Sequence, residues 1–282
     1  MKDEPLSPAQ VEQFGRDGYI IIRGLFDIDE IGLLERAAKE DRVLDQNSFG
    51  RADGSGGSIR LSLWSDPGDN LYGMVARSNR IVGAMEQILG GSVGHYHSKM
   101  IMKDAKVGGA WEWQQDYGYW YDIGYLFPDL ASVMIAVDKA TVENGCLQVI
   151  KGSHRLGRIN HTATGQQAGA DLTRVGEVLK ELELVYCEME PGDAVFFHSN
   201  TLHRSDQNRS ENPRWAMICC YSRLGNNSAQ DPLHPTPLKP VDKVSDSAVR
   251  EAGTLRFGSA DGDNTFLNPN KHLGEELAAG ER

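Results

Sequence analysis

The sequence has no long apolar run, no cluster of basic residues and few cysteines. No stretch approaches the roughly 18 apolar residues that a membrane-spanning helix needs. The N-terminus, M-K-D-E-P-L-S-P, has no apolar segment of the kind found in a secretory signal. No Lys/Arg run offsets the net charge of −11. We therefore expect no nucleic-acid partner and no membrane partner.

The four cysteines are Cys146, Cys187, Cys219 and Cys220, and no two of them have C-x-x-C spacing. Two are adjacent inside an apolar stretch. A disulfide scaffold or a zinc knuckle would need paired spacings, so buried, reduced thiols are the better interpretation. Reduced thiols without a secretory signal predict a cytoplasmic protein.

The patterns along the 282 residues predict helices first and a β-rich region second. Ser7 to Asp17 begins with a capping serine and a proline, and Asp27 to Arg42 has apolar residues on one face. Residues 70–89 have helical periodicity, whereas residues 47–57 are polar and glycine-rich and are expected to form a loop. From about Val93, short β runs such as A-S-V-M-I-A-V and W-A-M-I-C-C-Y alternate with turn residues.

The irregular spacing of these β runs matches a jelly roll better than a series of alternating strands and helices. The expected fold class is therefore mainly β with flanking helices around a jelly-roll, cupin-like core. We find no internal repeat and no clear linker, so residues 1–282 are expected to form a single domain. Its parts are N-terminal helices at about 7–90, a β core at about 93–223 with a partly helical insert at 157–184, and a polar tail at 224–282 that wraps the surface.

Residues 111–121 read W-E-W-Q-Q-D-Y-G-Y-W-Y and gather six aromatic rings around one carboxylate, Asp116, in a chain that is 8% aromatic. On a strand, alternation places Gln114 and Asp116 on one face, opposite most of the rings. The strand is expected to run through residues 113–119, and after Gly118 the chain can turn and bring Trp120 and Tyr121 to a substrate cavity. The alternative is that all six rings belong to the core.

Three separate stretches hold residues that suit one metal site. The first is Q-Q-D-Y with Asp116, and the second is P-G-D-A-V-F-F-H-S-N-T-L-H-R-S-D with His203. The third is N-P-R-W with Arg214, eleven residues after His203. A jelly roll can bring such residues together, because early and late strands lie side by side with side chains that face inward.

These stretches resemble the phytanoyl-CoA dioxygenase family of Fe(II)/2-oxoglutarate-dependent oxygenases. The segment E-N-G-C-L-Q-V-I-K-G-S-H at 143–154 and D-G-Y-I-I-I-R-G-L-F near the N-terminus also match that family, so the resemblance covers about residues 8–223. It implies a double-stranded β-helix core, Fe(II), the cosubstrate 2-oxoglutarate, and O2. In such an enzyme 2-oxoglutarate becomes succinate and CO2 while a C–H bond of the substrate is hydroxylated.

The resemblance also implies roles for individual residues. Family members hold iron with two imidazoles and one carboxylate, a combination that leaves positions open for cosubstrate and O2. Here Asp116 takes the carboxylate role and His203 the role of the distal histidine. Arg214 and Ser205 are expected to bind the far carboxylate of 2-oxoglutarate, with Asn144 as a further contact in the cofactor pocket.

His97 and Lys99 stand two residues apart on a predicted strand and are expected to face the substrate. A purely structural role for His97 is the alternative. The identity of the substrate does not follow from the sequence. The acidic charge of the chain gives no advantage in binding a CoA phosphate, so a small metabolite is favoured.

The chain departs from the family at Gln114. The family pattern is W-H-Q-D-Y, and this chain reads W-Q-Q-D-Y at 113–117. An amide oxygen is neutral and a poorer donor to Fe(II) than an imidazole, so weaker iron binding and slower turnover are expected. Three explanations stay open: an engineered His→Gln substitution, a natural variant that binds metal through Gln114 or recruits His97 or His198, and a natural pseudo-enzyme.

Two functions of other classes compete with the oxygenase. One is a non-catalytic jelly roll that binds a carboxylate ligand through Arg214, which the joint retention of Asp116, His203 and Ser205 opposes. The other is a metal-dependent isomerase or hydrolase on a cupin-like barrel, which usually gathers three histidines. Succinate release that depends on O2 distinguishes the oxygenase from both.

Overall fold

The computed structural model describes residues 4–53, 56–164, 167–231, 233–234, 236–258 and 265–267. Its helices are α1 (Pro8–Asp17), α2 (Ile28–Glu40), α3 (Arg42–Gln46), α4 (Leu71–Arg77), α5 (Asn79–Leu89), α6 (Asp116–Asp122), α7 (Leu172–Glu181) and α8 (Ala248–Ala252), with a short 3-10 helix at Ser153–Leu156.

The strands form a larger and a smaller antiparallel sheet. The larger sheet has the order β1 (Tyr19–Ile22), β11 (Ala194–His198), β6 (Leu130–Ala136), β13 (Arg214–Arg223), β4 (Val93–Lys103), β3 (Ser58–Trp64) and β2 (Phe49–Ala52). The smaller sheet has the order β10 (Leu184–Cys187), β7 (Leu147–Ile150), β12 (His203–Ser205) and β5 (Trp111–Gln114). A separate hairpin joins β8 (His161–Thr164) to β9 (Gln167–Ala170).

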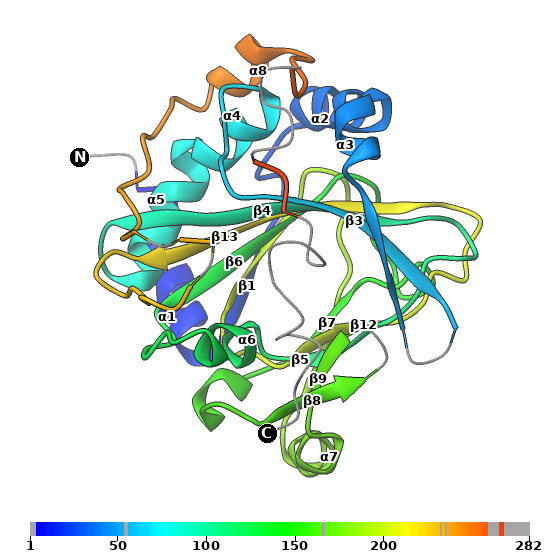
Figure 1. The fold of residues 1–282 in the computed structure, drawn as a ribbon, viewed down its shortest axis with the longest axis vertical. Helices are drawn as coiled ribbons and strands as arrows, with labels where there is room; N and C mark the ends of the chain where they lie inside the picture. The colour runs from blue at the N-terminus through cyan, green and yellow to red at the C-terminus, as the bar shows by residue number, and fades with distance from the viewer. Residues whose placement is uncertain are drawn as a thin grey trace.

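The two sheets face each other, and helices cover the outer face of the larger one. Figure 1 shows α2, α4 and α5 above β3, β4 and β13, with β5, β7 and β12 on the opposite side. This arrangement confirms the jelly-roll core with flanking helices that the sequence predicted.

Strong local signals set the first two helices. The hydroxyl of Ser7 accepts a hydrogen bond from the backbone N–H of Gln10, whose side chain bonds back to the N–H of Ser7. Gly18, in the left-handed region at φ 78°, ends α1. Asp27 and Glu30 form the same reciprocal cap at the start of α2. Both helices therefore begin where the sequence predicted.

Strand β13 is buried on both faces. Met217 and Cys219 pack in the cluster that holds the helices, whereas Ala216, Ile218 and Cys220 pack in the cluster between the sheets. Successive side chains of a strand point to opposite faces, so one strand supports both layers. This burial explains why W-A-M-I-C-C-Y is apolar without alternation.

All four cysteines have free, buried thiols, as predicted. Burial raises the pKa of Cys146 to about 11 and that of Cys219 and Cys220 to about 12. Cys219 and Cys220 face opposite sides of β13, so their sulfur atoms point away from each other. None of the helices within the described ranges is long and apolar enough to cross a membrane.

The single helix expected at residues 70–89 is wrong. Ser78 leaves the helical region, with φ −57° and ψ 142°, and separates α4 from α5. Here the backbone N–H of Asn79 donates to Val244, and the N–H of Val244 donates to Arg77. The tail therefore supplies hydrogen bonds that replace those of a continuous helix, a contact that local periodicity does not encode.

The loop expected at residues 47–57 is also wrong in part. Residues 49–52 form β2 and pair with the first residues of β3, so the loop prediction fails for these four residues. The carboxylate of Asp53 accepts hydrogen bonds from the backbone N–H groups of Gly57 and Ala110, each at 2.7 Å. Asp53 thereby ties this hairpin to the segment that leads into β5.

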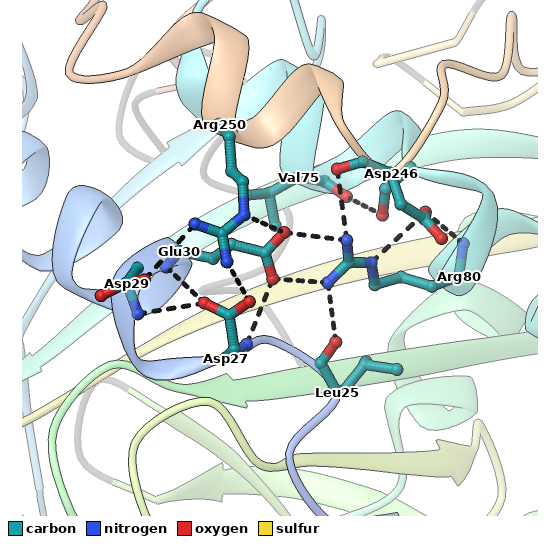
Figure 2. Close-up of polar contacts among 9 residues, drawn as sticks. Leu25, Asp27, Asp29, Glu30, Val75, Arg80, Asp246 and Arg250 are labelled. Atoms are coloured by element: carbon teal, nitrogen blue, oxygen red, sulfur yellow. Dashed lines mark hydrogen bonds and ion pairs between the residues drawn. The ribbon is translucent and has the colours of Figure 1, made fainter.

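The described part of the tail lies against the helices. Arg80 forms a bidentate ion pair with the buried carboxylate of Glu30, at 2.7 and 3.0 Å, and also donates to the carbonyl of Leu25 at 2.8 Å (Figure 2). In the tail, Asp246 contacts Arg80 at 3.3 Å, and Arg250 pairs with the acids at the start of α2. These contacts join α2, α5 and α8.

We predict that Arg80→Met lowers the free energy of unfolding by about 2 to 3 kcal/mol, because it leaves the carboxylate of Glu30 buried without its main partner. Urea unfolding followed by circular dichroism measures the change. The control is Lys180→Met, which removes an exposed ion pair with Glu177 and should change stability by less than about 0.5 kcal/mol. Equal losses in the two variants would contradict the assigned importance of the Arg80 pair.

Candidate active site

Gln114 and Asp116 lie where β5 ends and α6 begins. The expectation that residues 113–119 form a strand is wrong past Gln114, because Asp116 is the first residue of α6. The side chain of Gln115 causes the change of direction. It donates to the carbonyls of Gly157 and Asn200 at 2.8 Å and accepts from the N–H of Ile159 at 2.7 Å. These bonds hold the chain away from the sheet at this point.

A small cavity of about 40 Å³ lies between the two sheets, and all the predicted metal and cosubstrate residues except Asn144 line it. Its polar lining comes from five elements, namely β4, β5, β12, β13 and the start of α6. Apolar side chains form the remaining walls. The lining residues are Ile59, Lys99, Ile101, Trp111, Gln114, Asp116, Met134, Leu147, Phe197, His203, Arg204, Ser205, Arg214 and Ile218.

Three predicted ligands meet at one side of this cavity. Oδ1 of Asp116 lies 3.7 Å from Nε2 of His203, and Nε2 of Gln114 lies 3.0 Å from the same nitrogen. All three side chains are buried. The register of the smaller sheet explains part of this meeting, because His203 pairs directly with Gln114 across β12 and β5.

His203 is held in the tautomer that suits metal binding. Its Nδ1 lies 2.9 Å from the carbonyl oxygen of Thr201, which can only accept, so Nδ1 carries the proton. The lone pair of Nε2 is then directed to Asp116 and Gln114. Burial lowers the pKa of His203, and the negative charge of Asp116 opposes this shift in part. The neutral ring that a metal needs is therefore favoured.

Gln114 directs its amide nitrogen at that lone pair. Its Oε1 accepts a hydrogen bond from the hydroxyl of Tyr119 at 3.0 Å, which leaves Nε2 to donate to His203. One lone pair cannot accept this hydrogen bond and bind a metal at the same time. Gln114 can act as an oxygen ligand only after its amide group turns over and gives up the bond to His203.

Asp116 is supported by a residue that sequence reasoning missed. The hydroxyl of Ser132 on β6 donates to Oδ2 of Asp116 at 3.0 Å, leaving Oδ1 to face His203. Ser132 also lies 3.1 Å from the sulfur of Cys220. A polar residue inside the apolar run A-S-V-M-I-A was the available signal, since a buried hydroxyl needs a partner.

Arg214 and Ser205 meet at another side of the cavity, with Lys103. Arg214 is 2% exposed and donates through Nη2 to the carbonyl of Gly145 at 2.9 Å. Its Nε is buried without a hydrogen-bond partner among the described residues. Nζ of Lys103 donates to the hydroxyl of Ser205 at 2.8 Å and to the carbonyl of Asp206. Burial lowers the pKa of Arg214 to about 10 and that of Lys103 well below its usual range.

Lys103 was not predicted as a site residue. It follows Lys99 and Ile101 at two-residue steps on β4, and both of these line the cavity. Lys103 pairs directly with Arg214 across β4 and β13. The alternation of two lysines in K-M-I-M-K was the sequence signal, but only the pairing with β13 shows that both belong near one cavity.

The site fits a metal ion with two strong ligands and one weak ligand. One divalent cation can contact Asp116 and His203 together, since each ligand atom binds such ions at about 2.1 Å and the two atoms lie 3.7 Å apart. Gln114 fits only with its amide turned. No group of three or more His, Cys, Asp or Glu side chains that could hold a metal occurs in the described ranges, and this site has only two such side chains, Asp116 and His203. The orphaned Nε of Arg214 fits a carboxylate ligand.

Asn144 does not line the cavity. Its side chain accepts a hydrogen bond from the N–H of Thr141 at 2.8 Å and donates to the carbonyl of Lys139 at 2.8 Å. It shapes the turn that presents the carbonyl of Gly145 to Arg214. Its predicted role as a cofactor contact stays a prediction.

Trp120 and Tyr121 differ in environment. Trp120 is buried and packs edge-on against Tyr96, with ring centroids 5.4 Å apart. Tyr121 is 45% exposed, and the guanidinium carbon of Arg158 lies 4.3 Å from the centroid of its ring. Neither residue belongs to the lining of the cavity. Their predicted contact with a substrate stays a prediction.

The histidines near the site also differ. His97 shares a strand face with Lys99, and neither of its buried ring nitrogens has a hydrogen-bond partner in the described part of the chain. His198 accepts a hydrogen bond from the N–H of Asn200, and its ring lies 5.5 Å from that of His154. Burial lowers the pKa of His198 to about 4, as expected for a core histidine.

Comparison with known sequences identifies the same family that the sequence motifs resemble. The profile of the phytanoyl-CoA dioxygenase (PhyH) family matches residues 14–216. L-proline trans-4-hydroxylase of Streptomyces griseoviridis is 31% identical over 271 residues, which cover 84% of this chain and 97% of that protein. Ectoine dioxygenase of Stutzerimonas stutzeri is 27% identical over 257 residues, covering 86% and 84% of the two chains.

Solved structures show the same fold. EctD from S. alaskensis in its apo form superposes with a TM-score of 0.71 at 23% identity, covering 87% of this chain and 89% of that one. The same protein with 2-oxoglutarate and 5-hydroxyectoine gives a TM-score of 0.64 at 23% identity, covering 81% and 80%. By its sequence, the chain belongs to the phytanoyl-CoA dioxygenase family of Fe(II)/2-oxoglutarate-dependent oxygenases.

Proposed function

We propose that this chain hydroxylates a small organic metabolite, with Fe(II) held by Asp116, His203 and Gln114. The observation that carries the proposal is the convergence of a carboxylate and a neutral imidazole 3.7 Å apart in a buried cavity. Bound iron, with 2-oxoglutarate as the reductant, supplies the activation of O2. Relatives named as a proline hydroxylase and an ectoine dioxygenase support a small substrate.

The protein's own residues bind and orient the reactants. Arg214 and Ser205 would hold the far carboxylate of 2-oxoglutarate, because Arg214 has a buried donor without a partner and Ser205 accepts from Lys103. The apolar walls, including Phe197 and Met134, exclude water from the reacting groups. The hydroxyl of Ser132 keeps one oxygen of Asp116 directed at the metal position.

Gln114 would weaken the metal site without abolishing the fold. The amide is a neutral ligand, and its nitrogen must give up the hydrogen bond to His203 before its oxygen can face a metal. A binding module without catalysis gains no support, because the relatives are dioxygenases and the buried polar groups of an oxygenase site are present together. We therefore propose an oxygenase with reduced iron affinity and slow turnover.

We predict that Gln114→His tightens Fe(II) binding on the order of tenfold or more and raises turnover, since imidazole replaces a poorer ligand. The measurement is an anaerobic titration with Fe(II) and 2-oxoglutarate, read from the visible charge-transfer band. Air is then admitted, and succinate is measured. The control is Gln230→His, which makes the same change at an exposed glutamine and should leave Fe(II) binding unchanged.

Equal iron affinity in the wild type and Gln114→His would show that Gln114 or another group is already a full ligand. Absence of the band and of succinate in both proteins would contradict the oxygenase proposal itself. A gain in Gln114→His alone would support both the ligand role of position 114 and the proposed reaction.

We also predict that Arg214→Met weakens 2-oxoglutarate binding by about tenfold to a hundredfold and leaves Fe(II) binding nearly unchanged, because it removes charged hydrogen bonds to one carboxylate. Calorimetric titration of each ligand measures both effects. The control is Arg223→Met at the exposed end of the same strand. If iron and 2-oxoglutarate affinities fall together, or if neither falls, the role given to Arg214 is wrong.

A further inference from the structure

Lys99, which the sequence predicted to face the substrate, has no ionic partner among the described residues. Lys99 lines the cavity together with Gln114, Asp116 and His203. Within the described ranges its ammonium group has no hydrogen bond or ion pair, and its defined contact is with the ring of Trp111, at 5.9 Å from the centroid. A lysine that faces a largely buried cavity without a counter-ion is costly unless a ligand supplies the negative charge.

Trp111 adds an unpartnered donor at the same place. Its ring lines the cavity, and its Nε1 is buried without a hydrogen-bond partner among the described residues. A buried indole N–H normally finds an acceptor. Lys99 and Trp111 therefore present two neighbouring donors and no acceptor, which is the pattern that a carboxylate completes.

Lys99 is separate from the group that would hold 2-oxoglutarate. It lies four residues before Lys103 on β4, so the two Cα atoms are about 13 Å apart along the strand. Lys103 is the residue that bonds to Ser205 and pairs in register with Arg214. Lys99 instead lines the cavity together with the proposed metal ligands Asp116 and His203.

The charges of the iron, the cosubstrate and the surrounding side chains leave the positive charge of Lys99 without a negative counterpart. The two negative charges of 2-oxoglutarate and that of Asp116 balance the iron and Arg214. Lys103 adds no full charge to this count, because burial lowers its pKa well below the usual range and favours the neutral amine. Arg204, the other cation of the lining, has its own partners, since it lies 3.5 Å from Asp206 and bonds to Gln148. One positive charge, that of Lys99, remains for a further ligand.

Beside Lys99, outside the lining of the cavity, lies a second polar side chain. His97, two residues earlier on the same strand face, has two buried ring nitrogens without partners in the described residues. Burial lowers the pKa of His97 well below its usual range, so the ring is neutral and offers one donor and one acceptor. A small molecule that placed an acidic group at Lys99 would therefore meet further hydrogen-bonding capacity beside it.

We propose that the primary substrate carries a carboxylate, which Lys99 and the indole N–H of Trp111 bind beside the metal position. The substrate class is thus a small organic acid with a free carboxyl group, and the relatives named as a proline hydroxylase and an ectoine dioxygenase direct the test to amino and imino acids. This inference rests on the proposed function and adds the substrate class to it.

The test uses the full chain with Fe(II) and 2-oxoglutarate at saturation, without O2. Small amino and imino acids, L-proline among them, are titrated beside their carboxamides, with binding measured by calorimetry and by the change in the visible band. We expect at least one acid to bind, and to bind at least about tenfold more tightly than its amide, because the amide cannot form the charged hydrogen bonds. Succinate release after air is admitted is the second measurement.

Four variants locate the effect. Lys99→Met should lower the affinity for the acid to that for the amide, whereas Lys99→Arg should keep most of the preference. Trp111→Phe keeps an aromatic ring but removes the indole N–H, and it should lower the affinity for the acid several-fold. Lys151→Met, at an exposed lysine on the outside of the protein, is the control and should change nothing. The affinity for 2-oxoglutarate should stay within about twofold in all four.

Several outcomes would overturn the inference. The inference is wrong if the amides bind as tightly as the acids, or if none of the acids binds. It is also wrong if the Lys99→Met variant still binds the acid more tightly than the amide. A loss of 2-oxoglutarate affinity in Lys99→Met as large as the loss for the acid would place Lys99 in the cosubstrate site instead. A wild-type chain that fails to bind 2-oxoglutarate overturns the proposed function as well, whereas normal 2-oxoglutarate binding without selectivity for acids overturns this inference alone.

Discussion

The double burial of β13 is the constraint on which the rest of the structure depends. Nine of its ten residues are buried, so each face of the strand must pack against an apolar layer. The helices supply one layer and the smaller sheet the other, with the cavity between the sheets. Arg214 stands at the first residue of this strand, and Lys103 and Lys99 lie on the neighbouring strand in register with it. The helices that cover the larger sheet and the polar site are therefore coupled through one strand.

The metal site shows how one ligand can change while the fold is kept. The tautomer of His203 is set by the carbonyl of Thr201, and the orientation of Asp116 by the hydroxyl of Ser132. Neither bond involves Gln114. The two strong ligands are therefore held in place whatever residue occupies position 114, and that residue decides how well a metal competes for the lone pair of His203.

Sequence predicted the features that depend on neighbours along the chain. The capping residues of α1 and α2 lie within a few residues of the helix ends that they determine. The β runs of the core likewise carry their own pattern of apolar residues. The grouping of Asp116, His203 and Arg214 followed from resemblance to a family, because no local pattern relates residues so far apart. The structure brings these three side chains to one cavity, as that resemblance implied.

The errors arose where distant residues decide the local conformation. The strand that was expected to pass through Asp116 ends because Gln115 bonds to the segment near Gly157 and to Asn200. The helix expected at 70–89 breaks at Ser78 because Val244 bonds there. The burial of Lys103 likewise depends on partners about a hundred residues later in the chain. Such contacts are properties of the folded chain and have no signature within a short window.

The four buried cysteine thiols are unreactive in the folded state, so their reactivity reports on opening of the structure. With their pKa values raised and their sulfur atoms enclosed, they offer almost no thiolate to an alkylating reagent at neutral pH. Cys219 faces the helices and Cys220 the interior between the sheets, so each becomes reactive only when its own layer separates from β13. The order in which these adjacent thiols are modified during slow opening would thus reveal which layer detaches first.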